Sequence, residues 1–177
     1  MTKRTRLAAL AASVLLIFSF SACAVDMSNT SSTSETSSQA EPTPEPEVSV
    51  DESKLDDNLD GLEEYMQAKK YISGTPTDMD ASFIGAKDGV KYISSFEGSN
   101  NITIELYEYD VNNLNETAQT IIDSVKKDGK FELMGMTADA VLSDSGKYLM
   151  VYKDSVGGEV HDEHAKKVKE AFKSFKK

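Results

Sequence analysis

Tryptophan is absent from the chain, cysteine occurs once, at position 23, and there are 19 basic residues against 30 acidic ones. A single thiol excludes an internal disulfide and a multi-cysteine metal site, so the fold must be stable on its hydrophobic core alone. The formal net charge of −11 and the lack of a basic stripe in the first half of the predicted domain argue against nucleic-acid binding. There is also no G-x-S-x-G nucleophile elbow, no phosphate-binding glycine loop and no calcium-loop pattern. We therefore predict no catalytic residues, no cofactor and a protein that is not an enzyme.

The first 23 residues follow the order of an export signal. They open with basic residues at positions 3, 4 and 6, continue as an uncharged, mostly apolar run over 7–20, and close with Ser21 and Ala22 before Cys23. The apolar run has 14 residues, fewer than the roughly 20 that a helix needs to cross a bilayer. The pattern therefore favours a signal peptide over a permanent transmembrane helix.

The four residues Phe20-Ser21-Ala22-Cys23 resemble the cleavage box of bacterial lipoprotein signal peptides, with Phe20 where that family usually has Leu. The resemblance implies removal of residues 1–22 and a lipid-bearing Cys23, which carries diacylglycerol and often a further acyl chain such as palmitate. Since two or more acyl chains hold a protein stably, we expect a lipid anchor on the extracytoplasmic face of the cell membrane, in a bacterial envelope. Cys23 could instead be a residue of a signal peptide cut nearby, a buried free thiol or half of an intermolecular disulfide.

Residues 23–50 are rich in Ser, Thr, Pro and Glu and have few apolar residues. Such a composition cannot offset the entropy of ordering the chain, so we predict a disordered tether. The alternating prolines Pro42, Pro44 and Pro46 favour a locally extended segment. The remaining residues, 51–177, are predicted to form a single small domain.

Apolar spacing within 51–177 predicts both helices and strands. Helical stripes cover 55–71, 114–125 and the segment after Gly158; Asn113 resembles the first residue of a capping box, and Gly129 is placed to end the second helix. Strands are expected at 82–86, 90–94, 102–107, 131–136, 138–142 and 147–153, with Lys87-Asp88-Gly89 as the turn of the first hairpin.

These elements predict an α+β fold in which helices pack on one face of an antiparallel sheet, because one-sided stripes need a partner surface. The order of strand, Tyr/Asp-rich exit and helix occurs twice, and the two helical stripes correspond at an offset of 47 residues. The repetition indicates a degenerate duplication of a hairpin-plus-helix unit.

His161 and His164, the only histidines, lie three residues apart with acidic neighbours, a spacing that places both on one side of a helix. A transition-metal site there is conceivable, but the stretch matches neither H-E-x-x-H nor H-x-x-E-H. We expect a solvated or partly buried helix start and keep the two residues as weak metal candidates.

Four tyrosines on or just after the best predicted strands form a candidate binding surface: Tyr107, Tyr109, Tyr148 and Tyr152. The alternative explanation is cross-strand packing at the margin of the sheet. On balance the sequence predicts an extracytoplasmic lipoprotein with a non-catalytic domain that binds a protein, a peptide or a wall component through its sheet face or edge. Two alternatives stay open: a metal-binding or enzymatic envelope factor that uses His161 and His164, and a structural spacer or surface antigen.

Overall fold

The computed structural model describes residues 48–177. The predicted signal peptide, Cys23 and most of the predicted tether lie outside the described residues. The helices are α1 (Leu59–Ala68), α2 (Glu116–Asp128) and α3 (Glu159–Ser174), with short 3₁₀ turns η1 (Glu52–Lys54) and η2 (Ala81–Ile84). The strands are β1 (Thr77–Asp78), β2 (Asp88–Ser94), β3 (Ile102–Glu108), β4 (Lys130–Leu133), β5 (Met136–Leu142) and β6 (Tyr148–Asp154). The predicted α+β class is confirmed.

The six strands form one antiparallel sheet in the order β1-β2-β3-β6-β5-β4. Its centre is the seven-residue pairing of β3 with β6, which joins two hairpins, β2-β3 and β5-β6. The short strands β1 and β4 are its two edges. The sheet is therefore open, and each edge strand has a neighbour on one side only.

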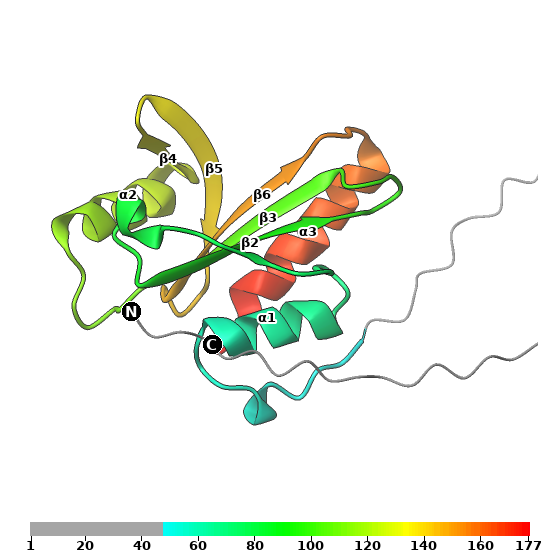
Figure 1. Ribbon diagram of the computed structural model, residues 1–177, viewed down its shortest axis with the longest axis horizontal. Helices are drawn as coiled ribbons and strands as arrows, with labels where there is room; N and C mark the ends of the chain where they lie inside the picture. Colours follow the sequence, from blue (N-terminus) through cyan, green and yellow to red (C-terminus); the bar gives the residue numbers. More distant parts are fainter. Residues whose placement is uncertain (1–47) are drawn as a thin grey trace, which may run out of the picture. The chain divides into compact units, whose positions relative to one another are not determined.

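Helices cover both faces of this sheet (Figure 1). Along β6, Tyr148 and Met150 pack with α1 and α3, whereas Leu149 and Val151 pack with α2. Successive strand residues point to opposite faces, so β6 is apolar on both. The prediction of helices on one face holds for α1 and α3 but not for α2, because the second apolar face also needs a cover.

The first predicted hairpin, 82–86 with 90–94, is wrong. Residues from Ala81 to Ile84 form η2, which ends at Gly85 with φ of 70°, and β2 pairs instead with β1 and β3. Gly89 lies within β2 opposite Tyr107, whose ring would be 2.6 Å from a Cβ at position 89. This glycine is needed to accommodate the tyrosine ring, and it does not form a turn.

The order of hairpin then helix does recur, as β2-β3-α2 and β5-β6-α3. The two helices nevertheless lie on opposite faces, so rotation about an axis normal to the sheet does not superpose the units. At the start of α2 the capping residue is Asn115, whose side chain accepts from the Ala118 N–H at 2.8 Å, and not the predicted Asn113. The predicted end of α2 at Gly129 is confirmed, with φ of 68°.

Candidate functional site

The four tyrosines of the predicted binding surface are divided between the two cores. Tyr107 and Tyr109 pack on the α2 side, and Tyr148 and Tyr152 pack on the α1/α3 side. Their burial raises the pKa of all four phenols, that of Tyr152 to about 12. Tyr109 and Tyr148 are 0% exposed and Tyr107 is 6% exposed. The structure therefore does not bring these side chains together on the surface, and their burial favours packing.

The two histidines do come together with aromatic and acidic residues where α3 meets the β2–β3 loop. His161 Nδ1 lies 2.8 Å from Asp154 Oδ2, and the His164 ring stacks on Phe96 with centroids 3.7 Å apart. Asn101 joins the loop to β6, since its side chain donates to the Phe96 carbonyl at 2.9 Å and to Asp154 at 3.0 Å. The cluster fastens the loop to the start of α3.

The electrostatics of this cluster follow from its burial. Desolvation lowers the pKa of His164. For Asp154, burial raises the pKa, but bonds from the Val156 N–H, His161 and Asn101 outweigh it and hold the pKa below its usual value. Within residues 48–177 no group of three or more His, Cys, Asp or Glu side chains could hold a metal ion. Here both imidazoles pack within the fold.

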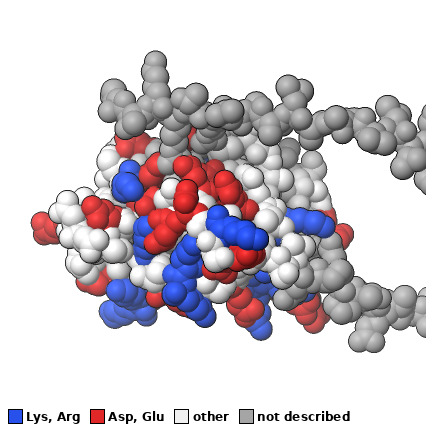
Figure 2. All heavy atoms as spheres, turned by 90° about the horizontal axis from the view of Figure 1, so that it is seen from below, with Lys and Arg blue, Asp and Glu red and all other residues white. Residues whose placement is uncertain are grey.

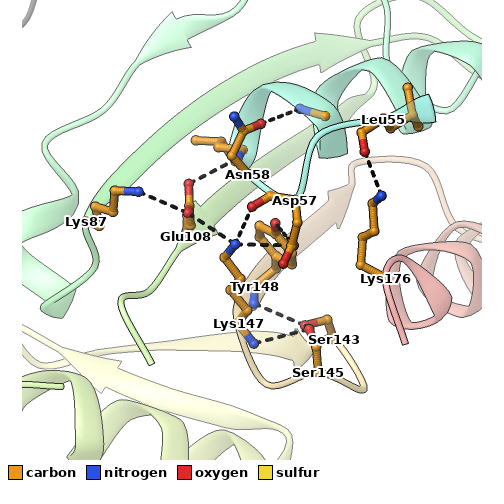
Figure 3. Close-up of polar contacts among 12 residues, drawn as sticks. Leu55, Asp57, Asn58, Lys87, Glu108, Ser143, Ser145, Lys147, Tyr148 and Lys176 are labelled. Carbon is orange, nitrogen blue, oxygen red and sulfur yellow. Dashed lines mark hydrogen bonds and ion pairs between the residues drawn. The ribbon is translucent and has the colours of Figure 1, made fainter. Parts of the chain in front are cut away.

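Sequence reasoning missed a polar network where the chain enters the domain (Figure 3). We call it the entry clasp, and it consists of two sets of residues: Glu52, Leu55, Asp57 and Leu59 from the entering chain, and Glu108, Lys147, Tyr148 and Lys176 that hold them. No single one of these residues belongs to a recognisable motif, because the partners lie 49 to 124 residues apart in the sequence.

The distances in the entry clasp are those of well-formed charge-assisted bonds. Lys176 Nζ donates to the carbonyl oxygens of Glu52 and Leu55, each at 2.6 Å. Tyr148 Oη donates to Asp57 Oδ1 at 2.7 Å, and Lys147 Nζ lies 3.2 Å from the same oxygen. Burial raises the pKa of Asp57, but these two donors outweigh it and keep the pKa below its usual value.

Glu108 is the buried carboxylate of the entry clasp. Its side chain is 5% exposed, and Oε2 accepts from the Leu59 N–H at 3.0 Å at the first turn of α1. Lys87 Nζ and Lys147 Nζ lie 3.2 Å and 3.6 Å from Oε1. A buried carboxylate needs such partners, since an unpaired one is costly. These contacts hold α1 against β3 and β6.

The face of the molecule around η1 and α1 is acidic. Figure 2, which views the molecule from below Figure 1, shows acidic side chains gathered there with lysines along the border. The exposed acidic residues of this segment are Asp51, Asp56, Asp57, Asp60 and Glu64. Such a charge excess disfavours contact between this face and anionic lipid.

The edge strand β4, like β1, has a neighbouring strand on one side only. A depression of 280 Å³ lies beside it, lined by Thr120, Ser124 and Asp128 of α2 and by Lys130, Phe131 and Glu132 of β4, among others. At the tip of the β4–β5 hairpin, Met134 and Met136 are 75% and 70% exposed, the highest values among the large apolar side chains of the described residues. The site combines backbone hydrogen-bonding groups, a groove and apolar side chains.

No known family profile matches the chain, and neither curated proteins nor solved structures gave a match. Within the part of the chain that the structure describes, no helix has both the length and the apolar character needed to span a membrane.

Proposed function

We propose that this protein is a lipoprotein anchored through Cys23 to the extracytoplasmic face of the cell membrane. Its non-catalytic domain binds a protein, a peptide or an envelope component through the β4 edge of the sheet. The observation that carries the proposal is the contrast between the entry clasp, where every charged group has a partner, and the β4 edge, where a groove and two exposed methionines lie beside one another.

The position of the entry clasp supports an anchored arrangement. A chain that reaches the domain at residue 48 is fixed within ten residues to the end of α3 and to β6. In Figure 1, η1 lies below the sheet and the β4–β5 hairpin projects above it. A domain tethered through its N-terminal side would thus present the β4 edge away from the point of attachment.

The chemistry of an edge strand supports binding. An unpaired edge offers a row of N–H and C=O groups to which an extended partner can add as a further strand, with grooves beside it giving specificity. The exposed thioethers of Met134 and Met136 add adaptable apolar contact. The alternative that uses His161 and His164 has less support, because Asp154 and Phe96 already engage both rings.

A photo-crosslinking amino acid placed at Glu132 in the full chain, in intact cells, tests this function. We expect a crosslinked product from position 132 and none from position 126. Lys126 is an exposed residue on the other side of α2 from Ser124, since two residues turn a helix by about 200°. Equal products from both positions, or no product from either, would contradict binding at the edge.

The anchor is tested separately with Cys23→Ser. We expect the lipid mass to disappear from the mature N-terminus and the protein to leave the membrane fraction. Retention of the Cys23→Ser chain in that fraction would contradict a lipid anchor at this residue, whatever the crosslinking result.

A further inference from the structure

We propose that the partner of the β4 edge is the β4 edge of a second copy of this chain, so that two sheets join into one across a two-fold axis. The inference rests on the proposed function, because it names the partner of the same edge. Three observations carry it: the backbone groups that point outward, the charges that flank them and the groove beside them. The length of the strand sets the expected affinity.

The outward-pointing backbone groups belong to Lys130 and Glu132. Hydrogen-bonded and non-hydrogen-bonded residues alternate along an antiparallel pair. Gly129 accepts from the Ala140 N–H at 2.9 Å and therefore faces β5, as do positions 131 and 133. Positions 130 and 132 must then face away from β5. The Lys130 carbonyl confirms this direction, since it accepts from Ser124 Oγ of α2 at 2.8 Å.

The charges of these two residues make β4 complementary to itself. If Phe131 lies opposite Phe131 of the second copy, Lys130 of each chain lies opposite Glu132 of the other. In this register the outward N–H and C=O groups of position 130 meet those of position 132 in the other copy. The Lys130 carbonyl can accept this hydrogen bond in addition to the one from Ser124, because it has two lone pairs. Two opposite-charge cross-strand pairs form, each worth about 0.2–1 kcal/mol. A shift that placed Glu132 opposite Glu132 would instead oppose like charges.

A groove lies beside β4. It is lined by Thr120, Ser124 and Asp128 of α2, by residues of β4 and by Thr137 of β5. In the proposed register Leu133 lies opposite Gly129 of the second copy, where even a Cβ would have no other atom within 4 Å. The hairpin tip with Met134 can therefore extend past the end of the neighbouring β4.

The length of β4 sets the strength of the contact. With only four residues in the strand, the interface falls at the weak end of specific protein–protein contacts. Anchoring on one membrane raises the effective concentration of the copies, so a weak edge contact becomes populated there. The dimer is thus expected on the membrane and, in detergent solution, only at high protein concentration.

Charge reversal and charge exchange test the register directly. The full mature chain is purified in detergent, and its dimer dissociation constant is measured by density-matched analytical ultracentrifugation. We expect Lys130→Glu to raise the constant at least ten-fold, because two like-charge pairs replace two attractive ones. The double variant Lys130→Glu/Glu132→Lys restores complementarity in the same register and should return the constant to within about three-fold of the original.

The matched control is Lys126→Glu, which makes the same change in net charge outside the groove and should leave the constant unchanged. Thermal unfolding of each variant confirms that it is folded. A monomer at all concentrations, or a dimer indifferent to Lys130→Glu, overturns the proposed self-association. If crosslinking from position 132 then captures a different protein, binding at the edge stands and only its partner changes.

Discussion

The entry clasp lies at the ends of the central strands β3 and β6, whereas β4 is an edge of the sheet, and the two regions differ in how their polar groups are used. In the entry clasp a carboxylate that is 5% exposed has three nitrogen partners, from Leu59, Lys87 and Lys147. At the β4 edge, Lys130 and Glu132 are both exposed and direct backbone groups into a groove. The same residue types therefore stabilise the fold in one region and are available to a partner in the other.

The difference shows why charged residues alone did not identify a site. Burial forces a charge to find partners within the fold, so the most strongly bonded groups, such as Glu108 and Asp57, have the least capacity for a ligand. A strand edge carries its binding capacity in the backbone, which every sequence has. Substitutions in the two regions should consequently have very different effects on stability.

The largest expected difference in the free energy of unfolding is between substitutions of the apolar side chains next to each region. Phe175, beside the entry clasp, is 0% exposed. The centroid of its ring lies 5.2 Å from that of Tyr65 and 5.6 Å from that of Tyr148. Phe175→Ala should lower the free energy of unfolding by about 3–5 kcal/mol through loss of burial and a residual cavity. Met134→Ala, at the exposed hairpin tip, should change it by less than about 0.5 kcal/mol. Urea unfolding curves give the free energy of unfolding of both variants. A similar loss of stability in both would contradict the difference between the two regions.

A smaller difference is expected for the carboxylates. Glu108→Gln removes the charge that pairs with Lys87 and Lys147, and it should cost about 2 kcal/mol, since Lys87 is well exposed and its contribution is screened. Glu132→Gln should cost less than about 0.5 kcal/mol in dilute protein. Unfolding measurements on both variants check this order, and the prediction fails if Glu132→Gln is the more damaging.

The smallest effect is a pH dependence at His164. Burial lowers the pKa of this imidazole below 6.5 in the folded protein, so the unfolded chain binds the proton more tightly. Stability is then fully present above pH 6.5 and is lost as pH falls through the folded pKa, by at most about 1.4 kcal/mol per pH unit. His164→Phe keeps an aromatic ring against Phe96 and should flatten this part of the stability profile. An unchanged slope in the variant would assign the pH dependence to other groups.

The regular elements were predictable because their signals are local. Apolar residues continue along β6, where Tyr148 and Met150 belong to one core and Leu149 and Val151 to the other, and the end of α2 was correctly predicted at Gly129. The pairing partner of β2 was not predictable in this way. Gly89 gave the signal of a turn, whereas its lack of a side chain is used by Tyr107 on the next strand, 18 residues away.

Long-range arrangement also decided which candidate site residues came together. Alternation placed the tyrosines on strands, but it did not reveal that helices cover both faces, and so it left their burial undetermined. The spacing of His161 and His164 correctly placed both in one cluster, while Phe96 and Asp154 enter it from other elements. The entry clasp depends on a lysine one residue from the end of the chain, for which the sequence offers no signal.

That penultimate lysine has a practical consequence for anyone who labels the protein. Lys176 bonds to both Glu52 and Leu55, and Lys177 pairs with Asp144 at 2.9 Å. An affinity tag or fluorescent protein fused directly after Lys177 would therefore disturb the contacts of η1 as well as those of the segment that follows α3. The exposed loop at Val111, Asn112 and Asn113 is the safer insertion point.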